Sequence, residues 1–217
     1  MILLFDLDGT ILDTYALIRE TFIELFKRFL PSYEYTEDDL RSFFGPSLYD
    51  TFKRIGCDEE KSKELFTEYR KINKTLQSKY LKLFPNTELF LEDLKSKGYK
   101  MAIFSNKVHE AIMSGLIEKG IDKYFLYVLG VDEVDYPKPN PQGIEIIKNR
   151  LKDECIYIGD TKSDMLTAKN AGVLAIGTTQ AGSKKEELID GGADYVIEKI
   201  SDLPKLLEVL KIWYMIC

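Results

Sequence analysis

Residues 1–14, MILLFDLDGTILDT, contain the feature that decides the fold. Ile2–Phe5 is a short apolar run, which predicts a strand that is buried on both faces. Asp6 and Asp8 follow where this strand ends. Because side chains alternate along a strand, both carboxylates can point into one crevice at the carboxyl end of a sheet, where α/β proteins bind ligands. Their mutual repulsion requires a cation, a shared proton or both, which makes this a candidate site for metal-assisted chemistry.

The composition is that of an ordinary globular protein and disfavours several classes of function. Of the 217 residues, 45% are hydrophobic and 30% are charged, and the formal net charge is −6. An acidic chain is not expected to bind nucleic acid, and no apolar run is long enough to span a membrane. Three cysteines without a CxxC spacing predict neither a disulfide framework nor a zinc site. We therefore expect a cytoplasmic protein.

The pattern of apolar residues changes twice along the chain. Between Thr14 and Leu83 the spacing is helical, with interruptions at Pro31 and Pro46 and no convincing strand. After Phe84, strands alternate with helices, which indicates a parallel sheet covered by helices. The expected strands are residues 100–104, 127–129, 155–158, 173–176 and 195–197, and the expected helices among them include residues 87–97 and 140–151.

These patterns predict an α/β fold with two domains. The core is expected to be a Rossmann-like parallel sheet in a three-layer α/β/α arrangement, formed by residues 1–14 and 84–217. An all-helical cap domain, residues 15–83, is inserted immediately after the two aspartates. The tail at 212–217 is unusually apolar, so it is expected to pack on the core or to form a dimer contact. We expect a monomer or a weak homodimer.

Three further polar clusters each follow an expected strand or lie between two of them. The strand KMAIF leads into Ser105 and Asn106, whose hydroxyl and amide can hydrogen-bond an oxyanion. Lys138 lies in YPKPNP, where prolines restrict the backbone on both sides. The strand CIYI leads into GDTKSD, which contains Asp160 and Asp164. Each cluster alone is commonplace, but their order and their positions along the chain point to one site.

In this order the clusters resemble the four motifs of the haloacid dehalogenase-like hydrolases, most of which are Mg²⁺-dependent phosphatases. The resemblance spans the chain, since the helical insert lies where that family has its first type of cap domain. It implies that Asp6 is the nucleophile, which becomes an aspartyl-phosphate, and that Asp8 is the general acid and then the general base. It also implies that Lys138 neutralises charge on Asp6 and the transferring group. Ser105 would hold a phosphoryl oxygen, with Asn106 lining the same pocket.

The same resemblance implies a Mg²⁺ cofactor. The carboxylates of Asp6 and Asp160 and the backbone carbonyl of Asp8 would bind the ion, and Asp164 would support its water shell. The physical chemistry agrees, because a phosphate ester and an attacking carboxylate are both anions and the site must supply positive charge. Mg²⁺ prefers oxygen ligands and keeps several waters, which suits a few carboxylates. The expected partner is a small phosphorylated metabolite.

Particular residues narrow the choice within the family. Asp8 disfavours the dehalogenases, because a halide leaving group needs no acid. The helix after Thr14 has no histidine, unlike the β-phosphoglucomutase-like members, and no lysine before Lys27, unlike the phosphonoacetaldehyde hydrolases. SNK, KPNP and GDTKSDMLTAKNAG look most like phosphoglycolate phosphatases, and FGPSL resembles a cap loop of pyrophosphatases in that group. Gly45 and Ser47 of this loop are therefore expected to contact the substrate.

The sequence thus predicts a phosphoric monoester hydrolase that acts on a phosphoglycolate-like ester through an aspartyl-phosphate. An inorganic pyrophosphatase or a nucleotide or sugar phosphatase is the alternative, and a phosphoglucomutase or a non-catalytic phosphate-binding protein is less favoured. A phosphorelay receiver domain would share the acidic cluster and the lysine. However, its phosphorylated aspartate lies on a middle strand and no helical insert follows its first strand.

Overall fold

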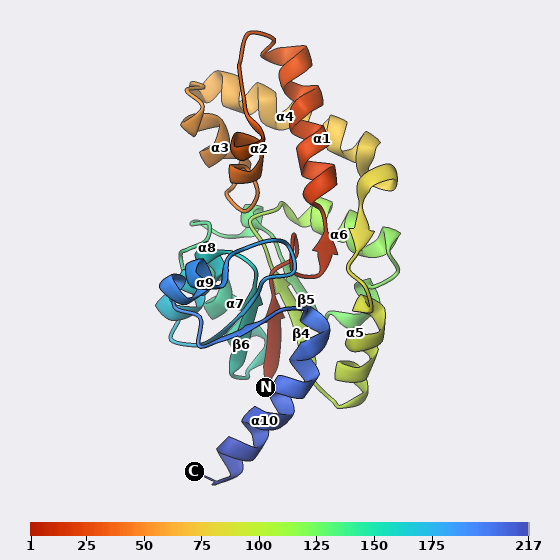
Figure 1. Ribbon diagram of the computed structural model, residues 1–217, viewed down its shortest axis with the longest axis vertical. Helices are drawn as coiled ribbons and strands as arrows, with labels where there is room; N and C mark the ends of the chain where they lie inside the picture. Colours follow the sequence, from red (N-terminus) through yellow and green to blue (C-terminus); the bar gives the residue numbers. More distant parts are fainter. Residues whose placement is uncertain (217) are drawn as a thin grey trace. The chain divides into compact units, whose positions relative to one another are not determined.

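The computed structural model describes the backbone of residues 1–216 and the side chains of residues 1–210. The chain forms two compact units, one made of Met1–Leu12 together with the chain from Leu83 onward, and one made of Asp13–Lys82 (Figure 1). The two boundaries predicted from the sequence lie after residues 14 and 83. The apolar tail at 212–217, with its expected packing or dimer contact, lies outside the described side chains.

The first unit contains a six-stranded sheet in which neighbouring strands are parallel. Its order is β5 (Tyr127–Leu129), β4 (Lys100–Phe104), β1 (Ile2–Phe5), β6 (Cys155–Gly159), β7 (Leu174–Thr178) and β8 (Tyr195–Ile197). All residues of β1 are buried, as expected of an inner strand of a parallel sheet. Phe5 pairs with Ile103 of β4 and with Ile158 of β6, so these three strands end at the same edge of the sheet.

Helices cover both faces of this sheet (Figure 1). On one face, Ile2 and Leu4 of β1 share a core with side chains of α7 (Gln142–Leu151), α8 (Lys162–Asn170) and α9 (Lys185–Gly191). On the other face, the ring of Phe5 lies 6.4 Å from the ring of Phe90, which is part of α5 (Thr87–Ser96). The unit also contains α6 (His109–Glu118) and α10 (Leu203–Ile216). The predicted three-layer Rossmann-like core is confirmed.

The second unit is built from four helices. They are α1 (Tyr15–Phe29), α2 (Glu37–Ser42), α3 (Leu48–Arg54) and α4 (Glu59–Tyr80). Aromatic side chains form its core, in which the ring centroid of Phe22 lies 4.8 Å from that of Phe43 and 4.9 Å from that of Tyr69. Thr36 and Asp39 cap α2 reciprocally, which explains why the acidic stretch after Thr36 begins a helix.

The structure differs from the sequence predictions at a few element ends. Two unexpected strands, β2 (Leu12–Asp13) and β3 (Lys82–Leu83), pair with each other, and two residues are too few to show an alternating pattern. The helix expected from residue 140 begins at Gln142, because Asn140 precedes a proline and is disfavoured in the helical conformation. A search of the described residues finds no helix that is long and apolar enough to cross a membrane.

Candidate active site

Four charged side chains singled out by the sequence analysis are buried together at the carboxyl edge of the sheet. Asp6 follows β1, Asp160 follows β6, Asp164 lies in the first turn of α8, and Lys138 lies in the loop before α7. Asp160 is fully buried, and the exposed fractions of the others are 1% for Asp164, 5% for Asp6 and 7% for Lys138. Burying charges is costly unless they are paired, so their contacts determine what the site can hold.

Lys138 pairs with two of the three carboxylates. Its Nζ lies 2.6 Å from Oδ1 of Asp6 and 2.7 Å from Oδ1 of Asp164. It also lies 5.6 Å from the ring centroids of Phe104 and Tyr157, where cation–π attraction adds to the pairing. Burial alone would lower the pKa of Lys138, but Asp164 and Asp6 outweigh burial and hold that pKa well above its usual value. Lys138 is therefore a permanent positive charge.

The three carboxylates carry more negative charge than Lys138 can neutralise. Burial raises the pKa of Asp6 to about 7, with Lys138 opposing the shift and Asp164 adding to it. Burial, together with Asp6 and Asp164, raises the pKa of Asp160 well above its usual range. These shifts mean that the ionised cluster is short of positive charge, which a divalent cation would supply.

One oxygen of Asp160 has no hydrogen-bond partner. Thr10 donates from Oγ1 to Oδ1 of Asp160 at 2.9 Å, whereas Oδ2 is buried and unpartnered among the described residues. Gly9, with φ of +84°, makes room for this carboxylate, since a Cβ at Gly9 would lie 2.3 Å from Oδ2. Oxygens of Asp6, Asp160 and Asp164 lie within 4.8 Å of one another. An unpartnered carboxylate oxygen in such a cluster fits Mg²⁺, which binds oxygen ligands.

Asp164 differs from Asp160 because both of its oxygens already have partners. Its Oδ2 accepts from the backbone N of Thr161 at 2.9 Å and from Oγ1 of Thr161 at 2.6 Å, in the capping box that begins α8. Its Oδ1 accepts from Nζ of Lys138 and from the hydroxyl of Tyr157 at 3.2 Å. This arrangement favours the predicted supporting role of Asp164 over direct binding of a metal.

The loop after β4 links the predicted phosphate-binding residues to Lys138. Ser105 is 3% exposed, and its Oγ accepts from the backbone N of Lys107 at 3.3 Å. Asn106 accepts with Oδ1 from the backbone N of Lys138 at 2.9 Å. Because this bond joins the two loops, the positions of Ser105 and Lys138 depend on each other.

Asp8, the predicted acid and base, is more exposed than Asp6. Its side chain is 17% exposed, and both of its oxygens accept from Nζ of Lys107, at 2.9 Å and 3.2 Å. The side chain of Lys107 is also 17% exposed. The edge of the sheet therefore carries two lysines, of which Lys138 faces Asp6 and Lys107 faces Asp8.

Four residues that organise this edge were not predicted from the sequence: Thr10, Lys107, Tyr157 and Gln180. Thr10 and Lys107 lie inside motifs quoted above, where their donor groups were the available signal. A tyrosine in a buried strand was also a signal, because its hydroxyl needs a partner, and Tyr157 donates to the carbonyl oxygen of Phe104 at 3.1 Å. Gln180 donates from Nε2 to the carbonyl oxygen of Thr10 at 2.7 Å, and no motif marks it.

The predicted substrate contacts Gly45 and Ser47 belong to the helical unit. Gly45 has φ of +103°, a conformation that favours glycine. Ser47 is the N-cap of α3, where its Oγ accepts from the backbone N of Asp50 at 3.2 Å and donates to Oδ2 of Asp50 at 2.6 Å. The hydroxyl of Ser47 thus has a structural partner within its own unit, and its contact with a substrate stays a prediction.

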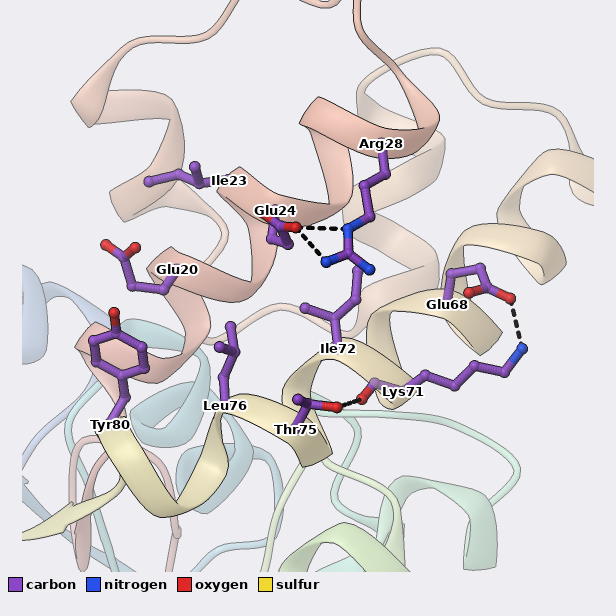
Figure 2. A pocket seen from close by; sticks show the side chains of 10 residues that line it. All are labelled: Glu20, Ile23, Glu24, Arg28, Glu68, Lys71, Ile72, Thr75, Leu76 and Tyr80. Atoms are coloured by element: carbon purple, nitrogen blue, oxygen red, sulfur yellow. Dashed lines mark hydrogen bonds and ion pairs between the residues drawn. The ribbon is translucent and has the colours of Figure 1, made fainter.

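A separate open pocket of about 500 Å³ lies in the helical unit between α1 and α4 (Figure 2). Four charged side chains on its walls form two pairs, Arg28 with Glu24 and Lys71 with Glu68, as the dashed lines in Figure 2 show. None of the predicted site residues lines this pocket. The candidate active site is therefore the carboxyl edge of the sheet.

Comparisons with known proteins agree with this geometry. Residues 3–178 match the family described as haloacid dehalogenase-like hydrolase. The chain is 37% identical to pyrophosphatase PpaX from Listeria monocytogenes over 204 residues, 93% of each chain. It is 33% identical to pyrophosphatase PpaX from Anoxybacillus flavithermus over 210 residues, 95% of this chain and 96% of the relative. A solved structure from Bacteroides fragilis, described as a haloacid dehalogenase-like hydrolase, matches with a TM-score of 0.87 at 29% identity, covering 93% of this chain and 98% of the other.

Proposed function

The chain belongs to the haloacid dehalogenase-like hydrolases, and from this we propose that it is a Mg²⁺-dependent phosphatase that hydrolyses inorganic pyrophosphate. The observation that carries the proposal is the environment of Asp6. This carboxylate is buried at the end of β1, paired with Lys138, and grouped with a carboxylate of Asp160 that has an unpartnered oxygen. A buried carboxylate suits nucleophilic attack on an anionic phosphorus centre when a fixed cation lies beside it and an unpartnered carboxylate oxygen is available to bind a metal ion.

Pyrophosphate is the proposed substrate, in place of the phosphoglycolate-like ester that was favoured from the sequence. The relatives called pyrophosphatase PpaX are similar to this chain over 93% or more of both lengths, so the similarity includes the helical unit as well as the sheet unit. The bond that is broken would then be a phosphoanhydride rather than a phosphate ester. Phosphoglycolate, nucleotides and sugar phosphates become the comparison substrates.

The proposed reaction has two steps. In the first, an oxygen of Asp6 bonds to phosphorus, the bond from phosphorus to the leaving oxygen breaks, and Asp8 gives a proton to that oxygen. In the second, Asp8 takes a proton from water, the water oxygen bonds to phosphorus, and the bond from phosphorus to Asp6 breaks. Lys138 and Ser105 stabilise the charge on the oxygens that remain on the transferring phosphorus. Two phosphates leave, and Asp6 and Asp8 return to their starting states.

We expect Mg²⁺ to be held by the carboxylates of Asp6 and Asp160 and by the backbone carbonyl of Asp8. When bound, the ion supplies positive charge that allows two anions to approach each other. Asp164 keeps its hydrogen bonds to Thr161 and Lys138 and so holds the surroundings of the ion in place.

A substrate panel tests the proposed function. The release of phosphate from pyrophosphate, phosphoglycolate, a nucleotide and a sugar phosphate is measured with Mg²⁺ in excess. We expect kcat/KM for pyrophosphate to exceed that for every other compound by at least about tenfold, a difference of about 1.4 kcal/mol in transition-state binding. A higher value for phosphoglycolate would restore the monoesterase prediction, and no hydrolysis of any compound would contradict both.

Thermal unfolding tests the metal assignment without relying on activity. A ligand that binds only the folded state raises the unfolding midpoint, so Mg²⁺ is expected to stabilise the wild-type protein. The variant Asp160→Asn offers a weaker ligand set and should show a much smaller Mg²⁺-dependent rise. Equal rises in the two proteins would show that Asp160 does not hold the ion.

A further inference from the structure

The contact between Lys107 and Asp8 has no role in the reaction as described so far. Lys107 places its Nζ 2.9 Å and 3.2 Å from the two oxygens of Asp8. Unlike Lys138, which is enclosed between Asp6 and Asp164, Lys107 is 17% exposed along its side chain. It is therefore a cation at the edge of the site that a ligand can reach.

Hydrogen bonds fix the backbone of Lys107, and this keeps its ammonium group within reach of Asp8. The backbone N of Lys107 donates to Oγ of Ser105 at 3.3 Å, and its carbonyl oxygen accepts from the backbone N of Val131 at 3.0 Å. Ser105 is itself held by a bond from its backbone N to the carbonyl oxygen of Leu129 at 3.1 Å. The loop after β4 is thus tied to the end of β5, and only the side chain of Lys107 is free to change partner.

We propose that Lys107 binds the negative charge of the leaving group and so selects substrates whose leaving group is an anion. This inference rests on the proposed function, in which Asp8 gives its proton to the leaving oxygen. An acid must lie within hydrogen-bond reach of that oxygen, about 2.6–3.2 Å. A lysine that contacts both oxygens of Asp8 is then within reach of an anionic group one or two bonds beyond the leaving oxygen.

Pyrophosphate and phosphoglycolate both carry such a group, a second phosphate in one case and a carboxylate in the other. Each would offer Lys107 a replacement for Asp8 as its partner. Each lysine then contacts one part of the substrate: Lys138 contacts the transferring phosphoryl group, and Lys107 contacts the leaving group. Loss of a hydrogen bond to a charged group weakens binding by roughly 10- to 100-fold, which sets the expected size of the effect.

The test compares substrates that differ in the charge of the leaving group. Lys107→Met is assayed with pyrophosphate, phosphoglycolate and 2-hydroxyethyl phosphate, the last being similar to phosphoglycolate but with a neutral leaving group. Loss of the contact with Asp8 affects all three substrates alike, so the expected signal is the difference between them: kcat/KM should fall roughly 10- to 100-fold more for the two substrates with charged leaving groups than for 2-hydroxyethyl phosphate. Lys107→Arg, which keeps the charge, should restore most of the selectivity.

Lys100→Met is the matched control. Lys100 lies at the other end of the same strand, β4, and its Nζ pairs with Oδ2 of Asp153 at 3.0 Å. Removing this lysine changes the net charge equally but should leave all three kcat/KM values unchanged. Lys107→Gln provides a second neutral variant if Lys107→Met fails to fold, as judged by circular dichroism.

The outcomes separate this inference from the proposed function. If Lys107→Met lowers kcat/KM by the same factor for all three substrates, Lys107 acts only on Asp8 and the inference is wrong. If the wild-type protein hydrolyses no phosphate compound, the proposed function fails. Calorimetric binding of methylenediphosphonate and of methylphosphonate then decides the inference. Weaker binding of the diphosphonate alone in Lys107→Met supports it, and unchanged binding of both ligands overturns it.

Discussion

In the sheet unit the charged side chains of the candidate active site are buried and pair with residues far away in the sequence, whereas the ion pairs within α4 of the helical unit join residues one turn apart and are largely exposed. Lys138 contacts Asp6, 132 positions earlier, and the pair is almost completely buried. In α4, Lys63 contacts Glu59, four positions earlier, and both side chains are more than half exposed. Buried pairs are costly to break, while exposed pairs contribute little.

The comparison shows where each unit obtains its structure. The helical unit depends on its aromatic core, in which the rings of Phe26 and Phe43 lie 5.8 Å apart, and on helix caps such as Thr36. The edge of the sheet unit depends on a network of charges that only the complete fold brings together. Substitutions should therefore have large effects at the edge of the sheet and small effects on the surface of the helical unit.

The largest expected effect follows from Asp6→Asn. It removes the proposed nucleophile, so kcat should fall by about 10⁴-fold or more. It should also stabilise the metal-free protein at high pH, because burial raises the pKa of Asp6 to about 7, well above its usual value of 3.8. The folded state then binds a proton more tightly than the unfolded state, and stability falls as pH rises from about 4 to about 7. Asparagine carries no charge and removes this contribution.

Urea unfolding in EDTA at pH 5 and pH 8 measures this effect. Asp6→Asn should lose less stability than the wild-type protein between the two pH values. Activity above about 1% of wild type would contradict a nucleophilic role for Asp6, since removal of a nucleophile costs far more. An equal change in stability between the two pH values in both proteins would contradict the raised pKa of Asp6.

The next effect in size is the loss of Lys138. Lys138→Met leaves Asp6 and Asp164 buried without their cation, which should lower the free energy of unfolding by about 3–5 kcal/mol. The loss should be greater at pH 8 than at pH 5, because carboxylates without a cation are tolerated only when they are protonated.

A double-mutant cycle gives the control for Lys138. Lys138→Met, Asp164→Asn and the double variant are unfolded in urea, and the double variant should cost at least about 1 kcal/mol less than the sum of the two single variants. Strict additivity would show that the 2.7 Å contact between these two side chains contributes nothing to stability.

The contrast between the units also explains what the sequence could predict. The ends of parallel strands meet at one edge, so Asp6, Ser105 and Asp160 could be brought together from strand patterns alone. The contact between Asp8 and Lys107 could not be predicted from strand patterns, because the reach of Lys107 depends on how the loop after β4 is fixed to β5.

The sequence also could not show which of two possible partners a polar side chain would take. Ser47 was predicted as a substrate contact, yet its hydroxyl also serves as the N-cap of α3, and both uses suit the same residue type. The two-residue strands β2 and β3 carry no periodic signal at all.

The smallest effect concerns this cap and tests the substrate prediction for Ser47. Ser47→Ala removes the bonds between Oγ and Asp50, which should lower the free energy of unfolding by about 1 kcal/mol. Thr36→Ala is the matched control, because Thr36 caps α2 in the same unit and is not predicted to contact substrate. Both variants should lose similar stability in urea. If Ser47 also contacts the substrate, only Ser47→Ala should change the ratio of kcat/KM for pyrophosphate to that for acetyl phosphate, and by more than about threefold, a difference of roughly 0.7 kcal/mol. An unchanged ratio in both variants would leave Ser47 with capping as its whole role and would move the search for specificity to Gly45 and to Lys107.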